Sequence, residues 1–427
     1  MKHSDKNRRD FIKYAGSGAA AFLLHGCDSG GDTQKVKPFN KFIETRKKAA
    51  HRKRRIIMNN DGNDLNAKKP DEPVTPEIFL GKRTTPLLGS HVDSIFYCTG
   101  VFNFYSHKSD ETELLTSDES AAKYVHELIQ QGTDSLEIMT KFCHDNNLEV
   151  FWSMRMNDNH DATRPFLLCE WKKNNPQYLM GKQGDEFPYV RGNWSIVDYA
   201  IPEVRDKVFR ILNDVAVRYD VDGLELDFFR HPAFFKPQVF GEPVTQQHCD
   251  LMTGLIRRIR TMAEETARKR NRPMLISVRI PDSVGYCKAI GLDTIRWLDD
   301  DLIDIIAAPG YFKLEPWENL VELGGRYNVP VYACFVSRRV MGGGEPEADT
   351  AIGKWRGEAL NAWNAGVDGI YTFNRFDPHD QLFRELGDPE LLRTLDRIDQ
   401  TNYAGESGYL DPEYWLKDGR DFILSGI

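Results

Sequence analysis

DGLELDFFRHP, residues Asp222 to Pro232, is the stretch that decides the fold. It predicts a short buried strand, Asp222 to Phe228, opened by Asp-Gly and closed by Arg-His-Pro. Because side chains alternate along a strand, Glu225 and Asp227 point to the same side. Burial of carboxylates is costly unless they are paired or hydrogen-bonded. The polar mouth of a (β/α)8 barrel accommodates such a pair as a functional site. The alternative is that both carboxylates are structural and pair with arginines of neighbouring strands.

Strand-like and helix-like segments alternate through the rest of the chain. The apolar strand-like runs are Arg54–Asn60, Val92–Cys98, Glu149–Met154, Asp222–Phe228, Met274–Ile280, Leu302–Ala307, Pro330–Phe335 and Val367–Phe373. Segments of helical period lie near Pro76–Arg83, Ser120–Asn146, Pro202–Tyr219, Thr245–Arg270, Leu292–Leu298, Pro316–Arg326 and Thr350–Ala365. Such alternation indicates an α/β fold with a parallel sheet, and eight repeats predict a closed (β/α)8 barrel. An open, doubly wound sheet is the alternative.

The N-terminal segment predicts export. Residues Asn7 to Lys13, NRRDFIK, resemble a twin-arginine signal, and an apolar run too short to span a bilayer follows it. The run ends in Leu24-His25-Gly26-Cys27, which resembles a lipobox in which Cys27 is lipidated. We therefore expect a signal over residues 1–27, a basic linker over 28–53, the barrel over 54–390 and a tail over 391–427 that packs on the barrel. The expected location is the cell envelope, with a lipid anchor in the membrane.

Charge is distributed unevenly between the linker and the body. Ten Lys and Arg stand between Lys35 and Arg55 beside the single acid Glu44, which is typical of contact with anionic lipid or of a solvated surface helix. Without residues 1–55 the chain keeps 41 Lys and Arg against 59 Asp and Glu, a net charge of about −18. This acidic body argues against nucleic-acid binding. The cysteines show no zinc-like spacing, and the oligomeric state stays open.

Polar residues follow nearly every predicted strand and would line one mouth of the barrel. We expect the substrate-binding residues to be Asn59, Asp61, Arg155, Asp158, His160, Arg230, His231, Tyr311 and Asn374. A rim of carboxylates, amides and arginines with aromatic neighbours suits a polyhydroxylated ligand, because sugars offer hydroxyls and C–H faces. The long irregular insertion Asp161–Ser195 follows the third strand and is predicted to lie over this mouth.

Five blocks of the sequence resemble bacterial glycoside-hydrolase-like family 10 proteins and their exported relatives. They are VDSIFYCTG (from Val92), FWSMRMNDNHD (from Phe151), NWSIVDYAIPEVRD (from Asn193), YDVDGLELDFFRHP (from Tyr219) and DGIYTFNRF (from Asp368). The resemblance implies a (β/α)8 glycosidase acting on a poly- or oligosaccharide. It matches Asp227 to the acidic residue that ends the fourth strand.

A second resemblance bears on mechanism. The run from Asp222 to Asp227 is similar to the DGxDxDxE strand of chitinase-type hydrolases, whose general-acid Glu would fall at Phe229. Phenylalanine cannot donate a proton, so we expect a two-carboxylate mechanism with Asp227 as nucleophile or base. The acid is Asp282, Glu315 or Asp158, with Asp282 favoured. Glu225, one repeat deeper in the strand, is expected to orient Asp227 or an arginine.

Other classes of protein remain as alternatives. A metal-dependent barrel hydrolase or isomerase would use His160, His231, Asp158 and Asp227, but no HxH follows the first strand. A non-catalytic, surface-anchored carbohydrate-binding protein is a further alternative. A nicotinamide-dependent enzyme is disfavoured because no GxGxxG follows a strand. We expect no metal and no cofactor.

Overall fold

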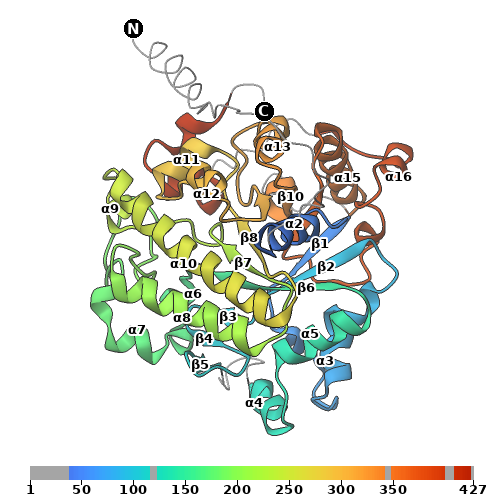
Figure 1. Cartoon of the computed structure of the whole chain (residues 1–427), viewed down its shortest axis with the longest axis horizontal. Helices are drawn as coiled ribbons and strands as arrows, with labels where there is room; N and C mark the ends of the chain where they lie inside the picture. Colours follow the sequence, from blue (N-terminus) through green and yellow to red (C-terminus); the bar gives the residue numbers. More distant parts are fainter. Residues whose placement is uncertain (1–37, 116–122, 342–347, 400–407, 425–427) are drawn as a thin grey trace, which may run out of the picture. The chain divides into compact units, whose positions relative to one another are not determined.

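A closed parallel barrel organises the chain (Figure 1). The computed structural model describes residues 38–115, 123–341, 348–399 and 408–424, and residues Phe42–Ile427 make one compact unit. Within the described residues eight strands close in the order β1-β11-β10-β9-β8-β7-β6-β2. They are β1 (Ile56–Asn60), β2 (Val92–Tyr97), β6 (Glu149–Arg155), β7 (Gly223–Asp227), β8 (Leu275–Arg279), β9 (Ile305–Ala308), β10 (Val331–Val336) and β11 (Gly369–Phe373). All the predicted strands are confirmed, and the open sheet is wrong.

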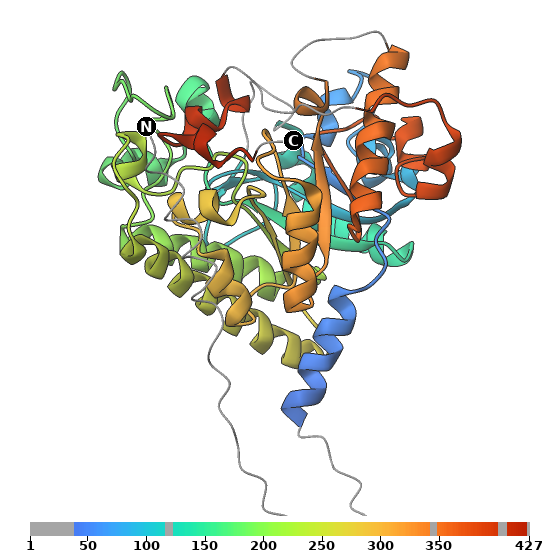
Figure 2. The same cartoon turned by 90° about the horizontal axis from the view of Figure 1, so that it is seen from above.

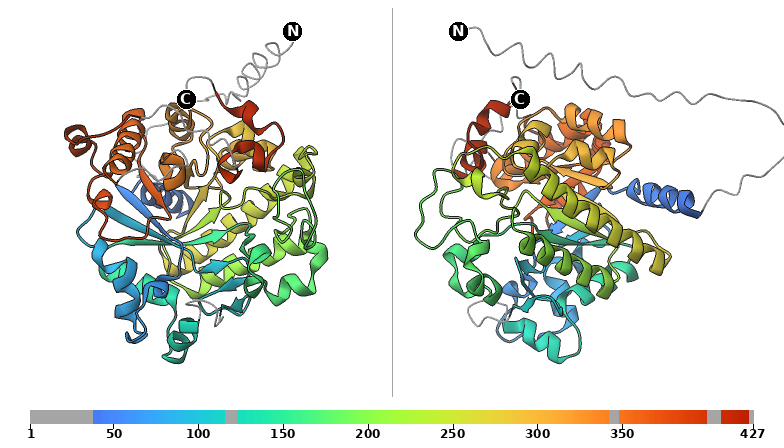
Figure 3. Two further views of the ribbon diagram at one scale, coloured as in Figure 1. Left: turned by 180° about the vertical axis from the view of Figure 1, so that it is seen from behind. Right: turned by 60° about the vertical axis from the view of Figure 1, so that its left-hand side comes forward.

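Helices surround the barrel, as Figures 2 and 3 show. Those outside the mouth are α3 (Pro76–Arg83), α4 (Lys123–Gln130), α5 (Ser135–Asp145), α8 (Pro202–Arg218), α10 (Gln246–Arg270), α11 (Val284–Ala289), α12 (Thr294–Asp299), α13 (Trp317–Tyr327), α15 (Ala348–Ala365) and α16 (Pro389–Thr394). Helices α8 and α10 lie side by side, with α8 against β7 and α10 against β8 (Figure 1). Each buries one apolar stripe, such as Val204, Val208, Ile211 and Val215 of α8.

Strand β7 follows its sequence pattern residue by residue. Leu224 and Leu226 are fully buried and alternate with Glu225 and Asp227, so the leucines face the helices and the carboxylates face the barrel interior. Gly223 opens the strand because no side chain fits there. A Cβ at this position would lie 2.2 Å from the Phe151 ring. The Asp-Gly pair is therefore required by packing between β6 and β7.

The predicted helix over Ser120–Asn146 is two helices in the structure. Helix α4 ends near Gly132, which has a φ of 90°, and α5 begins after Asp134. The Asp134 carboxylate accepts the backbone N–H groups of Leu136 and Glu137 at 2.9 Å. Glycine in the left-handed region followed by an N-cap aspartate ends one helix and starts another, which outweighs the continuous apolar period.

The basic segment before the barrel is partly helical. Helix α2 (Pro38–Ala50) carries Arg46, which is buried and pairs with Asp301 and Asp304. Lys47 also pairs with Asp301, at 2.5 Å. Part of this basic segment thus packs against the body of the protein through Arg46. The predicted export signal and Cys27 lie outside the described residues.

Two further properties concern the described residues as a whole. In them, no helix combines the length and apolar character needed to cross a bilayer. The cysteines Cys98, Cys143, Cys169, Cys249, Cys287 and Cys334 are buried and unpaired.

The last described segment, residues 408–424, contains α17 (Pro412–Trp415) and contacts loops near the mouth. Gln238 donates to the carbonyl of Trp415 at 2.9 Å, and the Val190 N–H donates to that of Tyr414 at 2.7 Å. The Tyr286 hydroxyl donates to the carbonyl of Pro412 at 2.9 Å. Figure 2 shows this segment, in red, beside loops coloured green.

The insertion Asp161–Ser195 contains the short helices α6 (His160–Thr163, which begins one residue before it) and α7 (Glu170–Asn174). Its two ends meet, because the Ser195 hydroxyl donates to the Asp161 carboxylate. The same carboxylate pairs with buried Lys172 at 2.6 Å. These bonds hold the insertion as a closed loop.

Candidate active site

Asp227 ends β7 and is clamped by the neighbouring strand. Arg279 of β8 stands opposite it in register and donates from Nε to Oδ1 and from Nη2 to Oδ2, both at 2.9 Å. The Phe229 N–H donates to Oδ1 at 3.0 Å. Burial alone would lower the pKa of Arg279, but the Asp227 carboxylate outweighs it and the pKa lies well above its usual value. The pair is thus ionic. This is what the alternative interpretation requires, in which Asp227 is structural and pairs with an arginine of a neighbouring strand.

Glu225 lies one repeat deeper and has different partners. The hydroxyls of Ser153 and Tyr371 donate to its Oε2, at 2.5 and 3.0 Å, and no described residue bonds its Oε1. Burial, with the negative charge of Asp227, raises the pKa of Glu225 to about 8. The raised pKa favours the protonated form of Glu225 near neutral pH, and its hydrogen-bond partners are hydroxyls rather than the Asp227 or the arginine expected from the sequence.

A second ionic network lies at the ends of β1 and β6. Arg155 donates to Asp61 at 2.6 Å and to Asp158 at 2.8 Å, and Arg230 donates to the other oxygen of Asp61 at 2.9 Å. Burial opposes ionisation of Asp61, but the charges of Arg155 and Arg230 outweigh it and lower its pKa. His160 contacts Asp158 through Nδ1 at 2.9 Å. The structure thus brings five predicted binding residues into one network.

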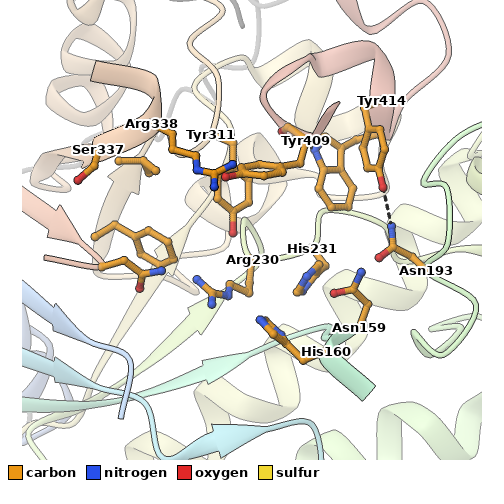
Figure 4. Close-up of a pocket in the computed structure, with 14 residues that line it drawn as sticks. Asn159, His160, Asn193, Arg230, His231, Tyr311, Ser337, Arg338, Tyr409 and Tyr414 are labelled. Atoms are coloured by element: carbon orange, nitrogen blue, oxygen red, sulfur yellow. Dashed lines mark hydrogen bonds between the residues drawn. The ribbon is translucent and has the colours of Figure 1, made fainter. Parts of the chain in front are cut away.

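A cavity of about 450 Å³ lies beside this network (Figure 4). Its volume falls in the usual range of small-molecule sites, about 300–1,000 Å³. It is lined by Asn159, His160, Asn193, Arg230, His231, Tyr311, Val336, Ser337, Arg338, Phe373, Asn374, Tyr409, Tyr414 and Trp415. The predicted residues His160, Arg230, His231, Tyr311 and Asn374 line it, as does Asn193 from the long insertion. Asp61, Arg155, His160 and Arg230 line a neighbouring cavity of about 270 Å³.

None of the carboxyls considered for catalysis lines either cavity: Asp227, Asp282, Glu315, Asp158 and Glu225. Asp282 is buried and accepts the backbone N–H groups of Leu314 and Glu315, at 3.0 and 3.1 Å. Burial raises the pKa of Asp282 to about 6. Glu315 is half-buried and accepts a bond from Asn319 at 2.9 Å. Asn59 is buried beneath the mouth and lines neither cavity.

Phe373 connects the first cavity with Arg279, the partner of Asp227. Its ring lines the cavity and lies 4.0 Å from the Arg279 guanidinium and 5.0 Å from that of Arg230. Arg279 itself is fully buried. Arg279 therefore lies directly behind this part of the cavity wall.

Residues 112–249 match the glycosyl hydrolase-like 10 family. The matched segment includes β6 and β7, and with them Arg155, Glu225 and Asp227. This match confirms the resemblance noted in the sequence and supports a glycosidase-type function. No curated protein matches the chain.

Solved glycosidases resemble the chain at low similarity. An α-L-fucosidase from Paenibacillus thiaminolyticus is 11% identical, with a TM-score of 0.46 over 80% of this chain and 49% of its own. An α-galactosidase from Geobacillus stearothermophilus is 12% identical, with a TM-score of 0.43 over 82% of this chain and 43% of its own. The catalytic domain of chitinase B from Arthrobacter TAD20 is 10% identical, with a TM-score of 0.44 over 83% of this chain and 98% of its own. The chain thus spans less than half the length of the fucosidase and of the α-galactosidase. The barrel assignment rests on the strand pairing.

Phe229, the residue expected where chitinase-type hydrolases have their acid, lies inside the glycosyl hydrolase-like 10 segment. Its ring is fully buried, packs 4.8 Å from the Phe312 ring, and would collide with a Cβ at Gly310, 2.6 Å away. The position is an apolar packing site, which agrees with the expectation that it supplies no proton.

Three residues of the metal-dependent alternative do come together. Ligand atoms of Asp158, His160 and His231 lie within 4.8 Å of one another, without Asp227. Burial lowers the pKa of His231 to about 3, so its ring is neutral. Arg155, however, already donates to Asp158 at 2.8 Å. A guanidinium in this place opposes a cation at the same carboxylate.

The sequence reasoning missed the contribution of the C-terminal segment to the cavity. Tyr409, Tyr414 and Trp415 line it, and the Tyr414 hydroxyl pairs with Asn193 at 3.2 Å (Figure 4). The signal was the density of aromatic residues in GYLDPEYW, Gly408 to Trp415. Its position far from any predicted strand end kept it out of the expected rim.

Proposed function

We propose that this protein is a glycoside hydrolase that cleaves a poly- or oligosaccharide at the mouth of its barrel. The observation that carries the proposal is the cavity of about 450 Å³, in which tyrosines and a tryptophan stand among amides, a serine and arginines. Aromatic faces and hydrogen-bonding groups around one cavity suit a sugar ring. The match to the glycosyl hydrolase-like 10 family supports the same function.

The carboxyl groups divide by protonation into candidate roles. Asp227 is ion-paired, and its role is that of nucleophile or base. Asp61 lines the neighbouring cavity, and its lowered pKa suits the same kind of role. The pKa values of Glu225 and Asp282, raised to about 8 and about 6, suit an acid that must hold its proton. In a two-carboxylate cleavage, Asp227 or Asp61 would act as nucleophile or base, and Glu225 or Asp282 would act as the acid.

Reaching the sugar requires a rearrangement at Asp227, because both of its oxygens are engaged by Arg279 and it lines neither cavity. Asp61 already lines the neighbouring cavity, although its two oxygens are also engaged, by Arg155 and Arg230. The two aspartates are therefore tested in parallel.

The test is a screen of purified protein for release of reducing ends from a panel of polysaccharides. Wild type, Asp227→Asn and Asp61→Asn are compared, with Asp145→Asn on the exposed end of α5 as the matched control. Loss of turnover in one of the first two variants, with folding and sugar binding retained, identifies the essential carboxylate. Azide rescue of that variant would support a nucleophile or a base. Absence of turnover by wild type on every glycan would contradict the proposal.

A second candidate is a carbohydrate-binding protein without hydrolysis. The observation in its favour is that, among the described residues that line the larger cavity, there is no carboxylate. This candidate predicts saturable binding of a glycan with no reducing ends released, and equal binding by Asp227→Asn and wild type.

Export and anchoring belong to the same proposal. The motif around Arg8 and Arg9 would direct the folded chain across the membrane, and Cys27 would carry the lipid. An envelope location would give the cavity access to polysaccharides outside the cytoplasm.

A further inference from the structure

The larger cavity has a cationic lining on an acidic protein. Its charged lining side chains include Arg230 and Arg338, and no carboxylate stands among the described lining residues. The chain beyond residue 55 carries a net charge of about −18. A local reversal of sign at a concave site is a physical basis for selecting anions, because the rest of the surface repels them.

The two arginines differ in what they already bind. Arg230 is buried, and one of its nitrogens is occupied by Asp61 at 2.9 Å. Arg338 is exposed in α14 (Ser337–Val340), directly after β10. In the described part of the chain no carboxylate pairs with Arg338, and its guanidinium lies 5.6 Å from the centre of the Tyr409 ring. Among the described residues, then, none occupies the donors of Arg338.

Aromatic side chains stand next to this guanidinium. The rings of Tyr409 and Tyr311 meet edge to face with centres 4.9 Å apart, and both line the cavity. Figure 4 shows Arg338, Tyr409 and Tyr311 along one side of the cavity and Arg230 with His231 on the other. A ligand between these sides would meet aromatic faces and a planar cation together.

We propose that the cavity binds a sugar residue bearing an anionic substituent, with the Arg338 guanidinium on Tyr409 as the group that recognises the anion. A guanidinium offers parallel donors that match a carboxylate or a sulfate, and the tyrosines offer faces for the C–H groups of the ring. The inference rests on the proposed function and assigns it an acidic glycan as the substrate class. Neutral amides such as Asn193 and Asn374 bind the hydroxyls.

The experiment measures equilibrium binding of three probes by calorimetry. They are an oligogalacturonate, the same oligosaccharide with its carboxyl groups reduced to alcohols, and a sulfated galactan oligosaccharide. The proteins are wild type, Arg338→Gln, Arg338→Lys and, as a control, Arg326→Gln. Arg326 is exposed at the end of α13 and does not line the cavity. Arg338 is exposed too, so its variants are expected to fold, which circular dichroism checks.

Wild type is expected to bind one acidic probe at least 10-fold more tightly than the reduced probe, with a preference that weakens as salt increases. Arg338→Gln should lose about 10-fold in affinity for the acidic probe and leave the reduced probe unchanged. Arg338→Lys should recover part of the loss, since it keeps the charge without the planar fork. Tighter binding of the oligogalacturonate would indicate a carboxylate as the recognised group, and tighter binding of the sulfated oligosaccharide would indicate a sulfate.

Equal binding of acidic and reduced probes, no binding of either acidic probe, or an equal loss in Arg326→Gln would overturn the inference. The outcome is separable from the hydrolase proposal because no step requires turnover. Selective binding of an acidic probe without cleavage of any glycan would contradict only the hydrolase proposal. Cleavage of neutral glycans, with no change in binding of the acidic probes by Arg338→Gln, would contradict only the inference about the anionic substituent.

Discussion

Asp227 and Arg279 face each other across β7 and β8 and share two hydrogen bonds of 2.9 Å, one to each carboxylate oxygen. Both side chains are almost fully buried. The register that places them opposite each other also places Arg155 on the other side of Asp227. Arg155 turns instead to Asp61 and Asp158, so the mouth contains two ionic networks on adjacent strands.

Replacement of Asp227 by Asn should lower the free energy of unfolding by about 3–5 kcal/mol, because the charge of Arg279 is left buried without its partner. Denaturant unfolding measures this change. The double variant Asp227→Asn/Arg279→Met removes both charges and should recover much of the loss. If Asp227 takes part in the chemistry, the double variant stays without turnover. Full recovery of turnover together with stability would show that Asp227 is structural.

Glu225 should make stability depend on pH. Its pKa is raised from 4.5 to about 8, so the folded state holds the proton over a range in which the unfolded chain has released it. The contribution of Glu225 to stability is therefore greatest below about pH 4.5 and falls as pH rises towards 8, by at most about 1.4 kcal/mol per pH unit. Glu225→Gln keeps an acceptor for Ser153 and Tyr371 and should abolish this slope.

The informative range for Glu225 is pH 6 to 8. Below it Asp282, whose pKa is raised to about 6, adds a slope of the same sign. Unfolding curves of wild type and Glu225→Gln at pH 6, 7 and 8 give the comparison. Parallel slopes for the two proteins would mean that Glu225 is already ionised in the folded state. Glu225→Gln should also cost less activity than Asp227→Asn, and the reverse order would move the essential role to Glu225.

The buried pair Arg54–Glu149 should matter for stability alone. Arg54 donates to both oxygens of Glu149, at 2.5 and 2.7 Å, before β1 and at the start of β6. This is the end of the barrel opposite the mouth. Glu149→Gln should cost about 3–5 kcal/mol, since a buried arginine loses its counter-charge. The exposed pair Lys141–Asp145 is the control, and Asp145→Asn should cost no more than about 0.5 kcal/mol. Similar losses in both variants would refute this ranking.

Removal of metal should leave glycan cleavage unchanged. Arg155 donates to Asp158 at 2.8 Å, which opposes a cation bound by Asp158, His160 and His231. Activity is measured before and after dialysis against a chelator, with metal content determined in both samples. A loss that zinc or another divalent ion restores would favour the metal-dependent alternative.

Anchoring should depend on Cys27 and export on Arg8 and Arg9. In Cys27→Ala the protein is expected to move from the membrane fraction to the soluble envelope fraction, because the lipid attachment is lost. Changing both arginines to lysine should keep the chain in the cytoplasm. A Cys27→Ala protein that stays membrane-bound would rule out the lipid anchor.

The sequence by itself determined the barrel and the place of its mouth. Strand β7 shows why: Leu224 and Leu226 alternate with Glu225 and Asp227, and such a period is a local property that one buried strand imposes on its own residues. The same local logic gave His160, Arg230 and Tyr311 as rim residues, since each follows a strand end, and all three line the cavity.

Only the tertiary structure decided which groups meet. Asp282 and Asp227 are both acids at strand ends. One accepts backbone N–H groups of residues 314 and 315, and the other is clamped by Arg279. The wall built by Tyr409 and Trp415 likewise comes from a segment far along the chain that packs back over the mouth. Pairing and enclosure depend on contacts between distant residues, and a period in the sequence carries no information about these contacts.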